Sequence, residues 1–176
     1  MKRIASVIAA FTFIFCVYTP AAFCAESVKP DAAGPAIGIM KGQVAPDFTL
    51  KDIGGKQIAL SSTKKSVVCL VFWATWCPYC VRDMPRYKEL YAKYAAKGLK
   101  ILSINIAAND PLQRVEAFQQ RTQMPYPILY DSAQDVCRLY YVTGVPVSVI
   151  IDRKGIIQYR GYQLPDNADQ LIAQLL

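Results

Sequence analysis

Trp73-Ala-Thr-Trp-Cys77-Pro-Tyr-Cys80 is the stretch of sequence that decides the fold. It follows the apolar run 67–72 and comes directly before a segment with helical periodicity. A strand that turns into a helix at Cys-x-x-Cys places the first cysteine at the helix N-terminus, where free backbone N–H groups and the helix dipole stabilise a negative charge. A thiol there has a lowered pKa and reacts as the thiolate. Because Cys80 lies one turn along the same helix, the pattern predicts a dithiol–disulfide exchange site.

The remaining sequence predicts strands and helices that alternate first and close with a hairpin and a helix. Strands are expected over 48–50, 57–60, 67–73, 99–106, 128–130, 147–151 and 156–160, and helices over 77–97, 110–123, 135–140 and 167–176. Residues 61–65 are expected to form a turn or short helix. In the helix over 110–123, Asp110 is predicted as the N-cap and Pro111 as the first helical residue. This order favours a three-layer α/β/α sandwich with a central mixed β-sheet.

Three motifs together resemble the thioredoxin-like family, in its exported branch typified by TlpA and ResA. They are the Trp-Cys of the cysteine motif, Gly144-Val145-Pro146 before the strand 147–151, and Ala45-Pro46-Asp47-Phe48 before a short strand. The resemblance runs from about residue 42 to residue 176. It implies that Pro146 is cis and lies against the two cysteines. It also implies that the segment 99–131 adds a helix and a strand to the minimal thioredoxin fold.

The resemblance also implies roles for the site residues. Cys77 is expected to attack a substrate disulfide and Cys80 to resolve the mixed disulfide, without a cofactor. The substrate-binding residues are expected to be Trp76, Pro78, Tyr79, Val145 and Pro146, with the Val145 backbone pairing with an extended substrate segment. The expected partners are specific disulfide-containing proteins, for example in cytochrome c maturation, and a membrane thiol reductant that restores the dithiol.

Two features depart from the family pattern. Thioredoxin carries a buried aspartate where this sequence has Val71, and Asp83 stands where TlpA-like proteins often carry glutamate. The Pro78-Tyr79 dipeptide matches glutaredoxins, whose potentials lie at about −200 to −230 mV, rather than thioredoxin at about −270 mV. The family branch and the exported location nevertheless imply a reductase fed by a membrane donor, with a potential between those of thioredoxin and the oxidant DsbA and nearer to that of thioredoxin.

Other functions remain open on the sequence. A disulfide-forming oxidant of secreted proteins, a peroxiredoxin-like peroxidase and a non-catalytic binding module would share the fold. A peroxiredoxin needs Thr or Ser three residues before its cysteine, and Ala74 stands at that place. A zinc site at Cys77 and Cys80 would need two more soft ligands, usually a second close pair. The remaining candidates, Cys69 and Cys137, are isolated from each other, and the chain has no histidine. These two cysteines are read as core thiols, with a disulfide between them as the alternative.

Length and charge fit one exported domain behind a targeting segment. The 176 residues carry a net charge of +7, and the basic residues are spread over several segments, which argues against a nucleic-acid partner. Residues 1–25, with a basic start and an apolar run, are predicted to be a signal peptide or a membrane anchor, the tether spanning 4–24. Residues 26–41 read as a linker and 42–176 as the domain. The expected location is periplasmic or extracytoplasmic, either soluble or anchored to the inner membrane.

Overall fold

The computed structural model describes residues 34–176. The predicted signal or anchor segment and the first part of the predicted linker lie outside the described residues. The end of that linker is tied to the domain, because Val44 forms isolated β-bridges with Ile37 and Ile156. Within residues 34–176, no helix combines the length and the apolar character that a membrane crossing requires.

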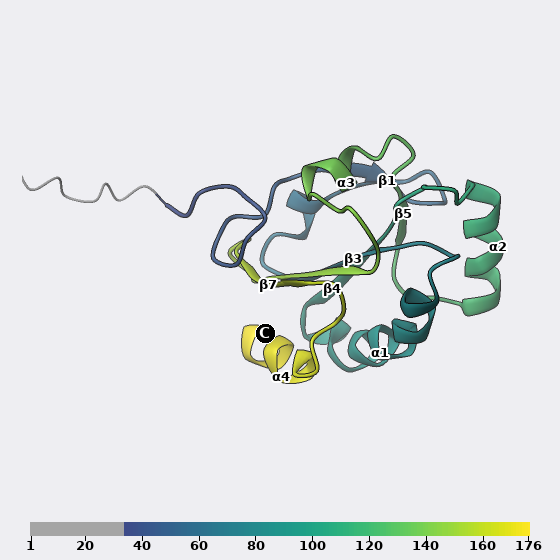
Figure 1. Cartoon of the computed structure of the whole chain (residues 1–176). Coiled ribbons are helices and arrows are strands. Elements are labelled where there is room, and N and C mark those ends of the chain that lie inside the picture. Colours follow the sequence, from purple (N-terminus) through teal and green to yellow (C-terminus); the bar gives the residue numbers. More distant parts are fainter. Residues whose placement is uncertain (1–33) are drawn as a thin grey trace, which may run out of the picture. The chain divides into compact units, whose positions relative to one another are not determined.

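A five-stranded mixed sheet forms the centre of the domain (Figure 1). Its strands are β3 (Val67–Trp73), β4 (Leu99–Asn105), β5 (Ile128–Tyr130), β6 (Val147–Ile151) and β7 (Ile157–Gly161). They lie in the order β5-β4-β3-β6-β7. The pairs β3–β4 and β4–β5 are parallel, whereas β3–β6 and β6–β7 are antiparallel. The predicted mixed sheet is confirmed, and β3 has the predicted bounds.

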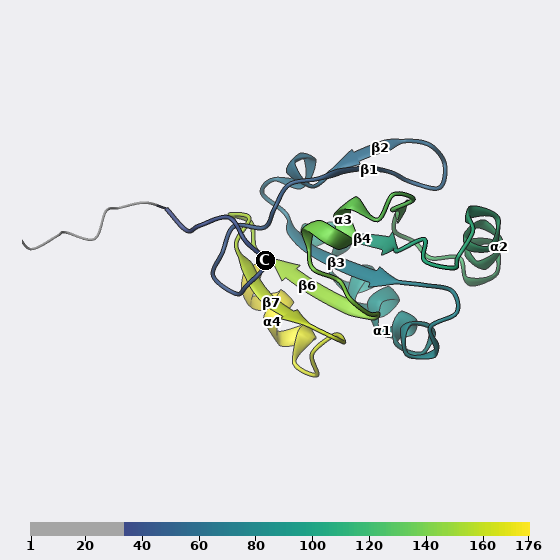
Figure 2. The same ribbon diagram turned by 45° about the horizontal axis from the view of Figure 1, so that its top comes forward.

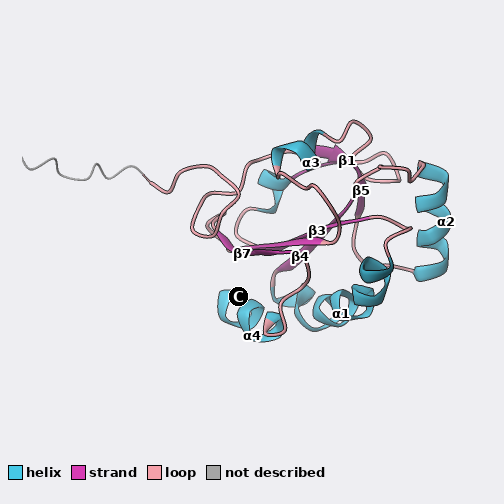
Figure 3. Ribbon diagram, viewed as in Figure 1, coloured by secondary structure: helices cyan, strands magenta, loops and turns pink. Residues whose placement is uncertain are grey.

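The helices cover both faces of this sheet. They are α1 (Pro78–Tyr94), α2 (Leu112–Thr122), α3 (Asp135–Leu139) and α4 (Ala168–Leu175), with short 3-10 turns at Leu60–Thr63 and Ala95–Lys97. Figures 2 and 3 show α1 and α4 on one face of the sheet. On the other face lie α3 and the hairpin of β1 (Thr49–Lys51) and β2 (Gln57–Ala59). This is the predicted three-layer sandwich.

Strand β3 lies at the centre of the core, because other elements pack against both of its faces. All seven of its residues are buried, as expected of a continuous apolar run in a central strand. Trp73 at its end is 1% exposed and its ring packs on Phe118 of α2, with 5.3 Å between the ring centroids. The strand that leads into the cysteine motif is therefore fixed by packing along its whole length.

The predicted cap of α2 is wrong. The helix begins at Leu112, its N-cap is Pro111, and no side chain caps it. Asp110 instead lies one residue before the cap and is 1% exposed. Both of its carboxylate oxygens accept hydrogen bonds from Thr75 or Asn105 and none from the helix backbone, so tertiary contacts override the local capping signal.

Candidate active site

Strand topology brings three loops to one end of the sheet. In the pairing register, Trp73 at the end of β3 lies beside Asn105 at the end of β4. Phe72 lies beside Val147, the first residue of the antiparallel strand β6. The loop that precedes the cysteines, the loop that ends at Pro146 and the connection from β4 to α2 therefore meet at this end.

Cys77 and Cys80 form a disulfide at the start of α1. Cys77 is the N-cap of the helix, with extended backbone (φ −87°, ψ 109°), and Pro78 is the first helical residue. Proline suits that position because its missing N–H would be unpaired there anyway. The backbone N–H of Cys80 donates to Sγ of Cys77 at 3.2 Å. The helix N-terminus therefore presents a hydrogen-bond donor to the sulfur of the first cysteine, as the sequence predicts.

The loop before β6 faces Cys77. The Val145–Pro146 peptide bond is cis, which confirms that prediction. Sγ of Cys77 lies 3.7 Å from the carbonyl oxygen of Val145. Pro146 is buried and Val145 is half-buried. The loop thus brings a backbone carbonyl oxygen to the sulfur of the first cysteine.

The remaining predicted site residues are exposed neighbours of the disulfide, whose own cysteines are buried. The side chains of Trp76 and Tyr79 are 48% and 57% exposed, and Pro78 is exposed too. The indole N–H of Trp76 donates to the carbonyl oxygen of Ala108 at 2.7 Å. The guanidinium of Arg82 lies over the ring of Tyr79, 5.0 Å from its centroid. Both aromatic side chains are thus held in place while a broad face of each remains open to solvent.

Asp83 is buried one turn along α1 from Cys80 and is 5% exposed. One carboxylate oxygen contacts Nε of Arg82 at 3.3 Å, while Oδ2 has no hydrogen-bond partner among the described residues. The position at which thioredoxin carries an aspartate holds the buried Val71 here, and Asp83 is the buried carboxylate of α1.

A polar pair lies deeper along the same helix. The hydroxyl of Tyr87 hydrogen-bonds to Oγ of Ser148 at 2.6 Å, and Ser148 pairs with Val71 across β3 and β6. Burial, followed by the nearby Cys69, raises the pKa of Tyr87, so its hydroxyl keeps its proton and remains a neutral group.

The two other cysteines of the described chain are not paired. Cys69 lies in β3 and Cys137 in α3, and both are buried free thiols. Burial raises the pKa of Cys69 to about 12. Burial, and then the hydrogen bond with Asp131, raises the pKa of Cys137. Both thiols therefore stay protonated and unreactive inside the folded protein. Within residues 34–176, no group of three or more His, Cys, Asp or Glu side chains is arranged to hold a metal ion.

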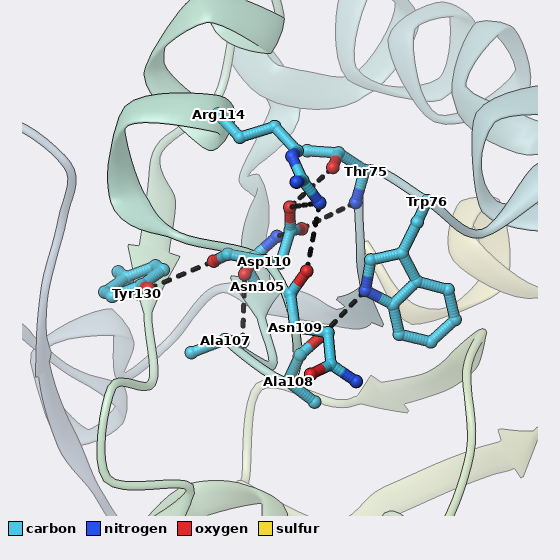
Figure 4. A network of polar contacts seen from close by, with 9 residues as sticks. All are labelled: Thr75, Trp76, Asn105, Ala107, Ala108, Asn109, Asp110, Arg114 and Tyr130. Atoms are coloured by element: carbon cyan, nitrogen blue, oxygen red, sulfur yellow. Dashed lines mark hydrogen bonds and ion pairs between the residues drawn. The ribbon is translucent and has the colours of Figure 1, made fainter.

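One set of site residues was missed on the sequence. Thr75, Asn105 and Asp110 form a hydrogen-bonded cluster directly behind the loop that carries Cys77 (Figure 4). The polar Asn105 at the end of β4 was the available signal, together with Asp110 at the end of the following connection.

Comparisons with known proteins agree with this geometry. The sequence model of the AhpC/TSA family matches residues 41–160. The chain belongs to the AhpC/TSA family. The thiol-disulfide oxidoreductase ResA of Geobacillus thermodenitrificans is 37% identical over 117 residues, which are 66% of this chain and 66% of ResA. The match thus spans just under two thirds of that relative.

Two further matches cover a larger share of the protein compared. The thioredoxin-like protein YneN of Bacillus subtilis is 37% identical over 123 residues, or 69% of this chain and 71% of YneN. A crystal structure from Chlorobium tepidum, provisionally assigned as the thiol:disulfide interchange protein DsbE, superimposes with a TM-score of 0.68 at 31% identity, covering 78% of this chain and 96% of that one. The predicted thioredoxin-like fold is confirmed, and the chain is similar to relatives named thiol-disulfide oxidoreductase ResA.

Proposed function

We propose that this protein is an exported thiol-disulfide oxidoreductase that reduces disulfides of specific protein substrates through Cys77 and Cys80. The observation that carries the proposal is the placement of Sγ of Cys77. It accepts the Cys80 N–H at 3.2 Å and lies 3.7 Å from the Val145 carbonyl oxygen. One sulfur therefore has both an anion-stabilising donor and a neighbouring backbone edge on which a substrate strand can align.

The reaction proceeds through two thiol–disulfide exchanges. The Cys77 thiolate attacks one sulfur of the substrate disulfide, a mixed disulfide forms, and the first substrate sulfur leaves as a thiolate that takes up a proton. The Cys80 thiolate then attacks Sγ of Cys77 and releases the second substrate thiol. The substrate disulfide gains two electrons and two protons, and the enzyme is left with the Cys77–Cys80 disulfide.

Each neighbouring residue has a place in this sequence of steps. Asp83 accepts the Cys80 proton before the second exchange, because it is a buried carboxylate on the same face of α1, one turn away. Trp76 and Tyr79 hold the polypeptide beside the disulfide with their exposed faces. Val145 and Pro146 supply the edge along which the substrate extends.

Export and recharging complete the proposal. Residues 1–25 direct the domain to the periplasmic or extracytoplasmic side, where it is either soluble or anchored through 4–24. There a membrane thiol-reductant donor returns the Cys77–Cys80 disulfide to the dithiol. Among possible substrates, we favour the protein disulfides that are reduced during cytochrome c maturation, as the resemblance to the TlpA and ResA branch implies.

Trapping tests the proposal directly. A Cys80→Ser variant expressed with its leader in a bacterial host should accumulate mixed disulfides through Cys77. These complexes should appear as additional bands on a non-reducing gel and disappear when dithiothreitol reduces them. The Cys77→Ser variant, which keeps Cys80, serves as the matched control and should trap little. The proposed function is wrong if Cys80→Ser traps no protein, or if the trapped proteins are found only in the cytoplasmic fraction.

A further inference from the structure

The carboxylate of Asp110 lies behind the turn that carries Cys77. It is 1% exposed, and both of its oxygens are engaged (Figure 4). Oδ2 accepts the backbone N–H of Thr75 and the Nδ2 amide of Asn105, each at 2.7 Å. Oδ1 accepts the hydroxyl of Thr75 at 2.5 Å. A single side chain from the β4–α2 connection thus binds both polar groups of Thr75, two residues before the first cysteine.

Several hydrogen-bond donors surround the carboxylate of Asp110. The groups that contact it are all donors, including Nη1 of Arg114 at 3.9 Å from Oδ1. The amide of Asn105 cannot turn its oxygen toward Asp110, because that oxygen accepts the backbone N–H of Ala107 at 2.9 Å. Hydrogen bonds to a carboxylate are stronger than bonds between neutral groups, so these contacts hold the turn firmly.

The same connection also binds the next residue of the turn. The indole of Trp76 donates to the Ala108 carbonyl at 2.7 Å. The connection is itself tied down, because the hydroxyl of Tyr130 donates to the Asp110 carbonyl at 3.0 Å. Figure 4 shows both contacts, that of Trp76 on Ala108 and that of Tyr130 on Asp110. Two consecutive residues just before Cys77 are therefore fixed to one rigid loop.

We propose that Asp110 is a positioning residue for Cys77, which acts by fixing Thr75 and so the strand-to-helix turn that carries the reactive sulfur. The proposal rests on the proposed function in that Cys77 is the attacking cysteine. The reactivity of Cys77 depends on the hydrogen bond that its sulfur accepts from the Cys80 N–H. After reduction the disulfide no longer holds the two residues together, so this hydrogen bond persists only if other contacts fix the turn. The Asp110 cluster supplies that hold, because none of its bonds involves either cysteine.

A purely structural role is the competing account, and Asp131 provides the comparison. Its carboxylate is also 1% exposed and accepts backbone N–H groups, those of Val136 and Cys137, at 3.4 and 2.8 Å. These bonds secure the start of α3, and none involves residues 73–80. If Asp110 serves only the fold, its loss should resemble the loss of Asp131. If it positions Cys77, only changes in the Asp110 cluster should alter the cysteine chemistry.

The test measures the alkylation rate of Cys77 in the reduced, full-length protein as a function of pH, with the label located by peptide mass spectrometry. Thr75→Val removes the hydroxyl and keeps the Asp110 charge, Thr75→Ser keeps the hydroxyl, and Asp131→Asn is the matched control. Asp110→Asn forms the fourth arm. Losing a nearby negative charge would by itself raise the thiolate fraction of Cys77, so slower alkylation in that variant can only reflect lost positioning.

Thr75→Val should raise the apparent pKa of Cys77 by about half a unit, which lowers the thiolate fraction below that pKa roughly threefold. Thr75→Ser should restore the wild-type profile, and Asp110→Asn should also slow alkylation. Asp131→Asn should lower the thermal midpoint and leave the profile unchanged. The proposal is overturned if folded Thr75→Val and Asp110→Asn react as wild type does, or if Asp131→Asn shifts the profile equally. Alkylation needs no protein substrate, so a failure of the proposed reductase function would appear separately, in the trapping experiment.

Discussion

The backbone N–H of Cys80 donates a hydrogen bond to Sγ of Cys77 at 3.2 Å, and no such donor is aimed at Sγ of Cys80 among the described residues. In the reduced protein this donor stabilises the thiolate of Cys77 alone. We therefore expect iodoacetamide to label Cys77 before Cys80 near neutral pH, with an apparent pKa for Cys77 below the usual value of about 8.5. Peptide mapping at short reaction times measures the order. Labelling of Cys80 first would reverse the assigned roles.

Pro146 should matter for protein substrates more than for small ones. Its ring fixes the backbone that holds the Val145 carbonyl beside Cys77, and alanine would free that backbone. For Pro146→Ala we expect kcat/KM with a protein disulfide to fall roughly tenfold, or about 1.4 kcal/mol of transition-state stabilisation. Turnover of a small disulfide should change little, because it needs no strand pairing.

The exposed Pro125 provides the control for that substitution, since Pro125→Ala alters a proline in the connection before β5. It should leave both rates as in wild type. Equal losses with the protein and the small disulfide would show that Pro146 does not serve substrate alignment.

The buried carboxylate of Asp83 should lower the free energy of unfolding while it serves catalysis. Its Oδ2 is buried without a hydrogen-bond partner among the described residues, and such a group carries a desolvation penalty of about 1–3 kcal/mol. Asp83→Leu should therefore raise the free energy of unfolding of the oxidised protein in urea, and slow the decay of the mixed disulfide by removing the proton acceptor of Cys80. Asp131→Leu, which removes a carboxylate with two backbone partners, should lower that free energy. A destabilised Asp83→Leu would contradict the penalty, and unchanged decay would contradict the catalytic role.

The internal thiols should respond to unfolding rather than to redox conditions. Because burial raises the pKa of Cys69 to about 12, its thiol is protonated at every pH below that value in the folded protein. In a Cys16→Ser/Cys24→Ser variant, the oxidised protein should show two thiols that react only after denaturation. A count of zero thiols in denaturant would instead indicate a Cys69–Cys137 disulfide.

The chemistry of the site could be predicted where it depends on local sequence. The apolar run of β3, the cap position of Cys77 and the proline at the first helical position are local signals, and the structure follows each of them. The role of Asp110 could not be predicted from local sequence. Its local context, one residue before a proline and a helix, is that of an N-cap, whereas its partner Thr75 is 35 residues away. Only the parallel pairing of β3 and β4 brings the two together, and that register cannot be read from either segment alone.

The Cys77–Cys80 reduction potential should lie between those of thioredoxin, about −270 mV, and DsbA, about −120 mV, and nearer to thioredoxin. Stabilising the thiolate favours the reduced form and raises the potential, and here the Cys80 N–H does so. Two features limit the effect. Pro78 has no N–H to offer, and the Val145 carbonyl oxygen, 3.7 Å from Sγ of Cys77, favours the protonated thiol over the thiolate. Equilibration with glutathione buffers measures the potential, and a value near −120 mV would make the protein an oxidant of secreted thiols.

Val145→Thr adds a hydroxyl that can donate to the thiolate and should move the potential to a less negative value. Val145→Ala, which adds no donor, should not, so equal shifts in both variants would show that side-chain size at this position, and not hydrogen bonding, sets the potential.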